Sequence, residues 1–238
     1  MEELETPNNT FDTLGEAWLF GLKKVMLNGV VVEDKAVRLK DVSLDENIDL
    51  LERYKSATDE AKLHLKLKEV CGHFVVIKEI SLDDEIVERF GDKTRIDYTK
   101  KRYSNDCGVG GYGEFIYGKN GENVRMVVDK LRVFKDSKSA VINAPNIWLG
   151  NEGKAPCLTA VVFLIRNGRL IMHTMYRSQN VYTKQLGNMI ALRDLQKRVA
   201  QELGVELGEV FLYVCSAHIY ESDWPRVNEI IEESVKEK

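Results

Sequence analysis

The dipeptide Asn167-Gly168 separates two apolar runs and places the strongest constraint on how this chain folds. The runs Cys157–Arg166 and Arg169–Tyr176 are each long enough for a strand. An Asn-Gly pair between two such runs predicts a two-residue turn, because both central positions of that turn need a positive φ. We therefore expect an antiparallel hairpin whose open end brings residues 176–178 close to Cys157.

Strands and helices are mixed along the rest of the chain without a strict alternation. The sequence predicts helices over residues 14–28, from Ser81 with Asp84 to Phe90, and over 122–134, 189–203 and 227–235. It predicts further strands over 62–68, 73–80, 140–142 and 210–215, and an extended segment ending at Tyr220. Thr13 and Glu16 form a capping box for the first helix, and Gly29 ends it. This mixture predicts one α+β domain over residues 1–238, with a mixed, largely antiparallel sheet flanked by helices and a flexible tail at residues 1–10.

The composition excludes several functional classes. A formal net charge of -4 argues against a nucleic-acid-binding protein, which needs a basic face. The chain contains no apolar run of the roughly 18–20 residues that a membrane span requires, and its acidic N-terminus lacks the basic start of a secretory signal. The four cysteines are scattered, without a CxxC pair that would indicate zinc. We expect a cytoplasmic protein with reduced thiols and no metal.

Six polar side chains at the hairpin and further along the chain are the candidates for a functional site. Cys157 follows Pro156 at the start of the first strand, and Arg177 and Ser178 follow the returning strand. A nucleophilic cysteine needs a nearby positive charge, and the hairpin offers Arg177 for that purpose. The alternatives are a buried cysteine and an arginine in a surface ion pair, which are the commoner fates of these residue types.

Three more candidates lie further along the chain. Asn188 follows Gly187, and local sequence favours a simple helix N-cap there; the functional alternative is an amide that recognises a pyrimidine edge. His218 and Tyr220 alternate along an extended segment and are expected on one face, either in a site or as a structural histidine and a rim tyrosine.

Other histidines and a glycine cluster are assigned structural roles. The histidines at 64, 73 and 173 lie among apolar residues and have no metal-ligand spacing. The segment Gly108–Gly113 lacks the Gly-Lys-Ser/Thr ending of a phosphate loop and is expected to turn tightly near the site.

The residue types of these candidates in Ala155–Tyr220, and the intervals between them, resemble those of the thymidylate synthase family, in particular its compact archaeal branch. Pro156-Cys157-Leu158 resembles the nucleophile motif, and Arg177-Ser178 resembles the phosphate-binding pair. Asn188 matches the asparagine that recognises uracil, and Ser216–Tyr220 matches the segment that binds the deoxyribose hydroxyl through His218 and Tyr220.

A weaker resemblance extends towards the N-terminus. Lys35 stands where the family's phosphate loop usually has an arginine, and Tyr117 in Phe115–Gly118 is similar to a tyrosine that assists proton removal. Lys138 and Ser139 stand where the family has two arginines that reach the neighbouring subunit's phosphate. Lysine offers a point charge in place of a bidentate fork, so a weaker phosphate grip is implied.

Three further positions depart from the family pattern. Asn180 replaces an aspartate that organises the folate, and Tyr176 replaces a glutamine. The chain ends in Val235–Lys238 without the apolar tail that closes over the cofactor in bacterial relatives, and the catalytic glutamate of the family is not located.

The resemblance implies the conversion of dUMP to dTMP. Cys157 would add to C6, Arg177 would hold the phosphate and favour the thiolate, Asn188 would bind the uracil edge, and Tyr117 would help remove the C5 proton. It also implies a homodimer with Lys138 serving the partner's site, and 5,10-methylene-tetrahydrofolate or a methylene-tetrahydromethanopterin-like donor contacted by Asn180. Two alternatives stay open: a pyrimidine-nucleotide hydroxymethylase, and a nucleotide-binding relative without catalysis.

Overall fold

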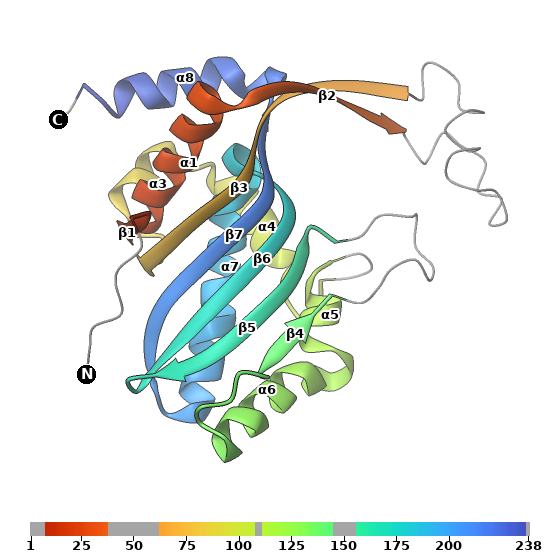
Figure 1. The fold of residues 1–238 in the computed structure, drawn as a ribbon, viewed down its shortest axis with the longest axis vertical. Helices are drawn as coiled ribbons and strands as arrows, with labels where there is room; N and C mark the ends of the chain where they lie inside the picture. Colours follow the sequence, from red (N-terminus) through yellow and green to blue (C-terminus); the bar gives the residue numbers. More distant parts are fainter. Residues whose placement is uncertain (1–7, 38–61, 108–110, 145–155, 237–238) are drawn as a thin grey trace, which may run out of the picture.

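The protein is built on one mixed sheet with strand order β1-β3-β7-β6-β5-β4, and β2 pairs with β3 beside this path (Figure 1). The computed structural model describes residues 8–37, 62–107, 111–144 and 156–236. The strands are β1 (Thr10–Thr13), β2 (Val30–Val37), β3 (Lys62–Glu79), β4 (Val141–Asn143), β5 (Leu158–Arg166), β6 (Arg169–Asn180) and β7 (Glu206–Tyr220). The pairs β1–β3 and β6–β7 are parallel and the other four are antiparallel, which confirms the expected fold class.

The helices lie mainly on one face of this sheet. They are α1 (Leu14–Asn28), α3 (Glu85–Phe90), α4 (Lys93–Lys101), α5 (Gly113–Tyr117), α6 (Glu122–Val133), α7 (Val181–Leu203) and α8 (Trp224–Glu233), with 3-10 turns at Lys119–Gly121 and Glu221–Asp223. In Figure 1, α4 and α7 lie behind β6 and β7, while α5 and α6 lie beside β4. No helix in the described part of the chain is long and apolar enough to cross a membrane.

The predicted hairpin is confirmed. Asn167 and Gly168 have φ values of 50° and 76°, the two positive values that the turn between β5 and β6 requires. The strand β6 continues past the expected end at Tyr176 as far as Asn180. This extension carries the polar residues that follow Tyr176 along the edge of β7, because β6 and β7 pair in parallel through Asn180 and His218.

The start of α7 corrects the sequence prediction. The expected helix began after Asn188, but α7 begins at Val181, and Asn180 is its N-cap with Oδ1 accepting from the Thr183 N–H at 3.0 Å. Gly187 does not end or start a helix. It lies inside α7. A Cβ at this position would stand 2.6 Å from the Cβ of Thr99 on α4, so glycine permits the two helices to pack closely.

Two strand predictions were too short. The segments 62–68 and 73–80 are parts of one strand, β3, in which Gly72 has a φ of 72°. The expected strand over 210–215 is the middle of β7. Glycine in a strand interior allows a local bend, so a polar-apolar pattern broken at Gly72 does not mean that the strand ends there.

The first helix confirms its predicted bounds and capping box, in which Thr13 Oγ1 accepts from the Glu16 N–H at 3.3 Å. Gly29 follows the last residue of α1 as predicted, with an extended φ of -69°, so the helix ends there without a left-handed residue. A Cβ at Gly29 would instead collide with the carbonyl oxygen of Val25. The expected tail is also shortened, since β1 begins at Thr10; residues 1–7 lie outside the described residues.

Smaller differences concern the middle of the chain and its end. The short helix α3 begins after its cap Asp84, later than Ser81 suggested, and α4 was not predicted. The last helix, α8, begins at Trp224, a few residues before the expected start at Val227.

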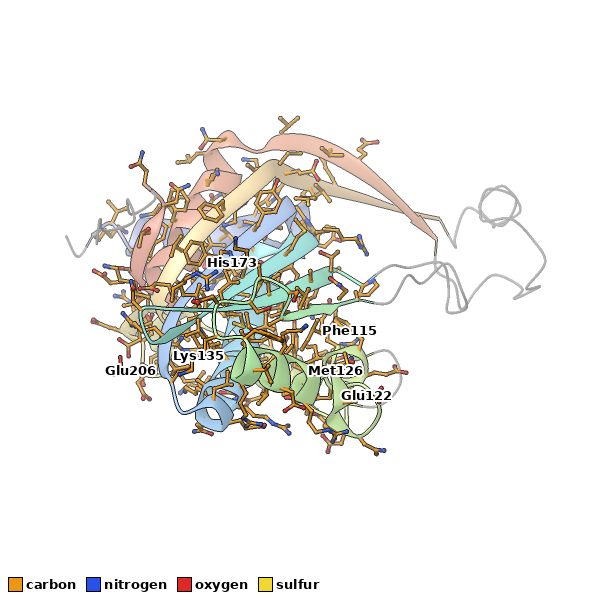
Figure 2. All side chains as sticks on the ribbon, turned by 60° about the horizontal axis from the view of Figure 1, so that its bottom comes forward. Phe115, Glu122, Met126, Lys135, His173 and Glu206 are labelled. Carbon is orange, nitrogen blue, oxygen red and sulfur yellow. The ribbon has the colours of Figure 1, made fainter. Side chains whose placement is uncertain are left out.

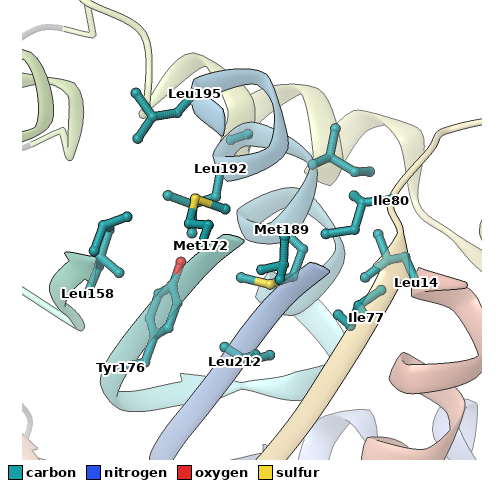
Figure 3. Packing of buried hydrophobic residues seen from close by; sticks show 14 of the residues in the cluster. Leu14, Ile77, Ile80, Leu158, Met172, Tyr176, Met189, Leu192, Leu195 and Leu212 are labelled. Carbon is teal, nitrogen blue, oxygen red and sulfur yellow. The ribbon is translucent and has the colours of Figure 1, made fainter. Parts of the chain in front are cut away.

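The hydrophobic core lies between the sheet and α7. Figure 3 shows Met172, Tyr176 and Leu212 from the strands beside Met189 and Leu192 from α7. All five side chains have no exposed surface. One hydrophobic cluster contains them together with residues of α1, α6 and α8, so the described elements share a single core.

The other face of β6 and β7 carries apolar side chains that none of the described helices covers. Strand alternation turns Met175 and Tyr213 away from the core that Met172 and Leu212 face. Met175 is 45% exposed and Tyr213 is 38% exposed. We call the surface formed by Phe74, His173, Met175, Phe211 and Tyr213 the open sheet face. The rings of His173 and Phe211 stack there at a centroid distance of 4.3 Å.

Candidate active site

A cavity of about 830 Å³ lies where β6 and β7 end and α7 begins. Its walls come from α4, the end of β6, the first turns of α7 and the end of β7. The lining residues are Arg95, Tyr98, Thr99, Arg102, Tyr112, Cys157, Arg177, Ser178, Gln179, Asn180, Thr183, Lys184, Asn188, His218, Tyr220 and Asp223. The cavity therefore contains most of the residues that the sequence proposed for one site.

The hairpin brings Cys157 and Arg177 together as expected. The Arg177 N–H donates to the Cys157 carbonyl at 2.8 Å, and Arg177 Nε donates to the Pro156 carbonyl at 3.1 Å. The Cys157 thiol is half-buried and belongs to the cavity wall. A half-buried thiol in the wall of a cavity that Arg177 also lines is placed where it can reach a ligand.

The parallel pairing of β6 and β7 aligns the next three candidates. Ser178 pairs with Ser216, and Asn180 pairs with His218. Ser178 Oγ lies 3.4 Å from His218 Nδ1, so these two side chains meet across the strands. The rings of His218 and Tyr220 are 5.2 Å apart, which confirms that the two residues share one face of β7.

One face of α7 forms the opposite wall. Asn180, Thr183, Lys184 and Asn188 follow a helical spacing and all line the cavity. Asn188 is only 4% exposed and lies in the second turn beyond the helix start, so the N-cap interpretation of this residue is wrong. Its carboxamide is available to a planar ligand in the cavity.

Tyr112 is a cavity residue that sequence reasoning missed. Burial, followed by the neighbouring Cys157, raises the pKa of the Tyr112 phenol, and both residues line the cavity. The flanking glycines were the available sequence signal. A Cβ at Gly113 would collide with the Ser104 carbonyl oxygen, so the chain approaches α4 closely there. Of the segment 108–113, residues 108–110 lie outside the described residues.

Two further tyrosines lie behind Tyr112. The hydroxyls of Tyr103 and Tyr176 are 2.7 Å apart in the protein interior. The rings of Tyr103 and Tyr112 are 4.7 Å apart. Burial is the main cause that raises the pKa of both Tyr103 and Tyr176, and Cys157 contributes to each shift. All three phenols are therefore neutral at pH 7.

Tyr117, the tyrosine proposed from the sequence, does not line this cavity. It is the last residue of α5, and its ring lies 5.4 Å from the guanidinium of Arg198 on α7. Burial raises the pKa of Tyr117, while Arg198 lowers it. The structure thus brings a tyrosine to Cys157, but from a position five residues earlier than expected.

Of the two expected lysines, Lys138 does not line the cavity, and the side chain of Lys35 lies outside the described residues. Lys138 is exposed in the connection between α6 and β4. Arg132, near the end of α6, donates to the carbonyl of Glu202 at the end of α7, whereas the cavity lies at the start of α7. Figure 2 shows Lys135, in the same connection, towards the end of the sheet where Glu206 begins β7. Lys35 belongs to β2, where its backbone pairs with residue 64 of β3.

Positive side chains dominate the charge of the cavity. Arg95, Arg102 and Lys184 join Arg177 in the lining, where the described residues include one carboxylate, that of Asp223. The Lys184 Nζ lies 5.5 Å from the ring centre of Tyr98. A cavity with this charge distribution attracts anionic ligands. Sequence analysis missed this group because the net charge of the chain is negative and α4 was not predicted.

Two buried polar groups in the lining lack a protein partner. Among the described residues, neither end of the Gln179 carboxamide is hydrogen-bonded, and the same holds for Thr99 Oγ1. Gln179 and Thr99 are each 3% exposed. Buried polar groups are normally paired, so a polar ligand would satisfy groups that the protein leaves open. The part of the chain described here contains no cluster of three metal-ligating side chains.

Comparisons with known proteins give the family. The family model described as thymidylate synthase matches residues 45–238. A curated protein of Methanothermobacter marburgensis described as "Putative thymidylate synthase" is 25% identical over 226 residues, covering 92% of this chain and 96% of that protein. One of Methanocaldococcus jannaschii with the same description is 28% identical over 193 residues, covering 74% of this chain and 86% of that protein.

A solved structure has the same fold. Thermostable thymidylate synthase A of Bacillus subtilis superposes with a TM-score of 0.59 at 13% identity, covering 92% of this chain and 84% of that one. The sequence match spans more than half of the chain and includes every cavity residue from Arg95 to Asp223. The chain belongs to the thymidylate synthase family.

Proposed function

We propose that the protein converts dUMP to dTMP through covalent addition of Cys157 to C6 of the pyrimidine. One observation carries the proposal: Cys157, Arg177, Ser178, Asn188, His218 and Tyr220 line a single cavity. The cavity of about 830 Å³ falls within the range of small-molecule sites and has room for a second molecule beside a nucleotide.

The nucleotide is held at three points. Arg177 and Ser178 bind the phosphate, supported by the positive end of α7, whose first turn contains no acidic residue. His218 and Tyr220 bind the deoxyribose hydroxyl from β7. Asn188 donates to O4 of uracil and accepts from N3–H, a pattern that cytosine reverses at position 4. These contacts orient C6 towards the Cys157 sulfur.

The chemistry begins when the Cys157 thiolate forms a bond to C6. The electron pair of the C5–C6 double bond moves towards O4, where the Asn188 amide stabilises the developing charge. C5 thereby becomes the nucleophile. Attachment of the donor's methylene carbon to C5 breaks one of its C–N bonds, and loss of the C5 proton allows the second C–N bond to break. A hydride from the donor, which is thereby oxidised, then completes the methyl group, and loss of the Cys157 sulfur restores the C5–C6 double bond.

Tyr112 is the best placed group to assist that proton transfer. Tyr112 lies beside Cys157 in the cavity lining, whereas Tyr117 does not line the cavity. A phenol with a raised pKa is neutral at pH 7, so it accepts the C5 proton only while it passes its own proton to water. We therefore assign to Tyr112 the role that the sequence suggested for Tyr117.

The outer part of the cavity takes the carbon donor. This co-substrate, 5,10-methylene-tetrahydrofolate or a methylene-tetrahydromethanopterin-like compound, supplies a one-carbon unit and the hydride that completes the methyl group. Tyr98 offers an aromatic surface, and Arg95, Arg102 and Lys184 offer positive charge for an anionic tail. Asn180 uses Oδ1 to cap α7, which leaves its amide nitrogen for the donor.

We also propose a homodimer that buries the open sheet face. Phe74, Met175 and Tyr213 lie in one row across β3, β6 and β7, and an exposed apolar row of this kind is typical of an interface. Lys138 is remote from the cavity of its own chain, so a role at a phosphate requires the partner's site. In the proposed homodimer, Lys138 of one subunit serves the phosphate site of the other.

Tritium release from C5-labelled nucleotides tests the reaction. We expect release from dUMP with either donor present, and none with dCMP, because Asn188 selects uracil. Cys157→Ser should abolish release while it still binds dUMP in calorimetry. Release that persists in Cys157→Ser would contradict the nucleophile assignment. Release from dCMP would favour a hydroxymethylase, and dUMP binding without release with both donors would indicate a non-catalytic relative.

A further inference from the structure

The tyrosine pair Tyr103–Tyr176 is a buried feature that the proposed reaction does not use. Tyr176 has no exposed surface and Tyr103 is 4% exposed. Their hydroxyls, 2.7 Å apart, are hydrogen-bonded to each other. Tyr176 lies in β6 directly before Arg177, and its backbone pairs with Leu158 of β5, the residue that follows Cys157. The pair is thus anchored to both strands that carry the thiol and its guanidinium.

The same pair supports Tyr112 from behind. The rings of Tyr103 and Tyr112 pack at 4.7 Å with an interplanar angle of 49°. The backbone on either side of Tyr112 is also fixed, because the Gly113 N–H donates to the Arg102 carbonyl at 3.1 Å. Gly111 and Gly113 permit this approach, since a Cβ on either would collide with the segment after α4. Tyr112 therefore has little freedom as long as Tyr103 stays in place.

We propose that the Tyr103–Tyr176 hydrogen bond is a positioning device that holds the Tyr112 hydroxyl against Cys157 and thereby sets the reactivity of this thiol. A phenol that donates to sulfur stabilises the thiolate more than the thiol, because the charged acceptor forms the stronger hydrogen bond. Tyr103 and Tyr176 act through Tyr112 and are positioning residues. The inference rests on Cys157 being the nucleophile of the proposed function.

The pairing of the two buried hydroxyls is the reason why either tyrosine substitution should disturb Tyr112. Replacing either tyrosine by phenylalanine leaves the other hydroxyl buried without this partner, which is unfavourable. We expect the remaining tyrosine to move so that its hydroxyl is no longer buried without a partner. The Tyr112 ring, which packs on Tyr103, should move with it. The charged groups near the thiol, Arg177 and Arg102, are unchanged by these substitutions, so a change in thiol reactivity reports on the phenols.

The test is the pH dependence of Cys157 alkylation by iodoacetamide, followed for the Cys157 peptide by mass spectrometry. For Tyr103→Phe and for Tyr176→Phe we expect a rate at pH 7 that is about 3- to 10-fold lower and a profile moved to higher pH by roughly half a unit to one unit. The double variant should match the single ones, because both remove the same hydrogen bond. The peptides of Cys71, Cys107 and Cys215 serve as internal references.

Tyr117→Phe is the matched control, because it removes a partly buried hydroxyl outside the cavity and should leave the Cys157 profile unchanged. Unmoved profiles in Tyr103→Phe and Tyr176→Phe, with or without a lower melting temperature, would overturn the proposal and leave the pair a purely structural role. Tyr112→Phe removes the phenol through which the pair acts, so it should shift the profile at least as much as the other two variants, and an unchanged profile in Tyr112→Phe would overturn the proposal even if Tyr103→Phe and Tyr176→Phe do not fold.

The alkylation assay contains neither nucleotide nor donor. It therefore measures the thiol even in a protein that fails to release tritium from dUMP. A shifted profile together with absent turnover would contradict the proposed function alone. An unshifted profile together with Cys157-dependent turnover would contradict the positioning role alone.

Discussion

At the scale of single residues, Asn188 is a polar side chain in the interior of a helix, and we propose that it recognises the base. Helix α7 has a buried, mostly apolar face, and Asn188 is a polar exception at a position that borders the cavity. A buried carboxamide costs stability unless it is paired, and in the proposed function a ligand with matching donors and acceptors would pair it. Uracil offers one acceptor and one donor on the edge that faces it.

Asn188→Asp should change the preferred base. A carboxylate accepts from the amino group of cytosine but cannot donate to O4 of uracil. We expect kcat/KM for dUMP to fall about 100-fold, which corresponds to about 3 kcal/mol, while dCMP becomes the better substrate for C5 exchange. Tritium release from both nucleotides measures this. Asn188→Ala is the control, because it should lower kcat/KM for dUMP without raising it for dCMP. An unchanged base preference in Asn188→Asp would contradict the proposed role of the residue.

The sequence located most of the site residues because each stands at a fixed interval from Cys157 in a recognisable motif. Tyr112 was missed because the same sequence offers a second tyrosine in a similar setting, and only the packing of Gly111 and Gly113 against α4 distinguishes them. Tyr117 was chosen by likeness of a short segment. Such a segment does not specify which way a five-residue helix turns its side chains.

At the scale of elements, the start of α7 decides the geometry of one cavity wall. Local rules favoured a helix start at Asn188 because asparagine beside glycine is a frequent boundary. The long-range contact between Gly187 and Thr99 of α4 overrides that rule, and no local pattern reveals it. The hairpin and α1 were predictable because turn and capping chemistry act within a few residues. The length of β3 and the existence of α4 were not, since both depend on packing.

Asn180 has a capping role that can be separated from its proposed contact with the donor. Asn180→Ala removes the acceptor for the Thr183 N–H and should lower the free energy of unfolding by about 1 kcal/mol. Asn180→Asp keeps the acceptor and adds negative charge at the positive end of the helix, so it should equal the wild type or exceed it by about 0.5 kcal/mol. Urea denaturation measures both. Equal losses in the two variants would show that the cap does not determine stability here.

At the scale of the whole molecule, a buried histidine couples stability to pH. His73 of β3 has no exposed surface, its ring lies 6.1 Å from that of Phe20, and burial, with Lys24 as a second cause, lowers its pKa from 6.5 to about 4. The folded state therefore keeps His73 neutral at a pH where the unfolded chain binds a proton. The resulting stability is complete above pH 6.5 and is lost as the pH falls towards 4.

His73→Leu should reduce the pH dependence of the free energy of unfolding between pH 7 and pH 4. Between pH 7 and pH 4 the wild type should lose about 3 kcal/mol more than the variant, which is the free energy of a shift of roughly 2.5 pKa units. Urea denaturation at several pH values gives the difference, in which the carboxylates common to both proteins cancel. If the free energy of unfolding changes with pH in the same way in both proteins, the pKa of His73 is not lowered in the folded state, and the prediction is wrong.

The open sheet face determines the expected assembly. Static light scattering should give twice the mass of one chain at micromolar concentration. Met175→Lys places a charge in the middle of the exposed apolar row and should raise the dimer dissociation constant at least tenfold, about 1.4 kcal/mol. Lys135→Glu, a charge change at an exposed position outside the open sheet face, is the control. A wild-type monomer at this concentration would contradict the proposed dimer.

The parallel pairing of β6 with β7 has a consequence for how the protein reaches its active form. These two strands are separated by the whole of α7, so their register forms only after a long loop of chain has closed. The cavity has Ser178 on one of these strands and His218 on the other. Nucleotide affinity should therefore appear late in refolding, after the β5–β6 hairpin and the helices have formed. A newly made chain would acquire its secondary structure before it acquires its ligand.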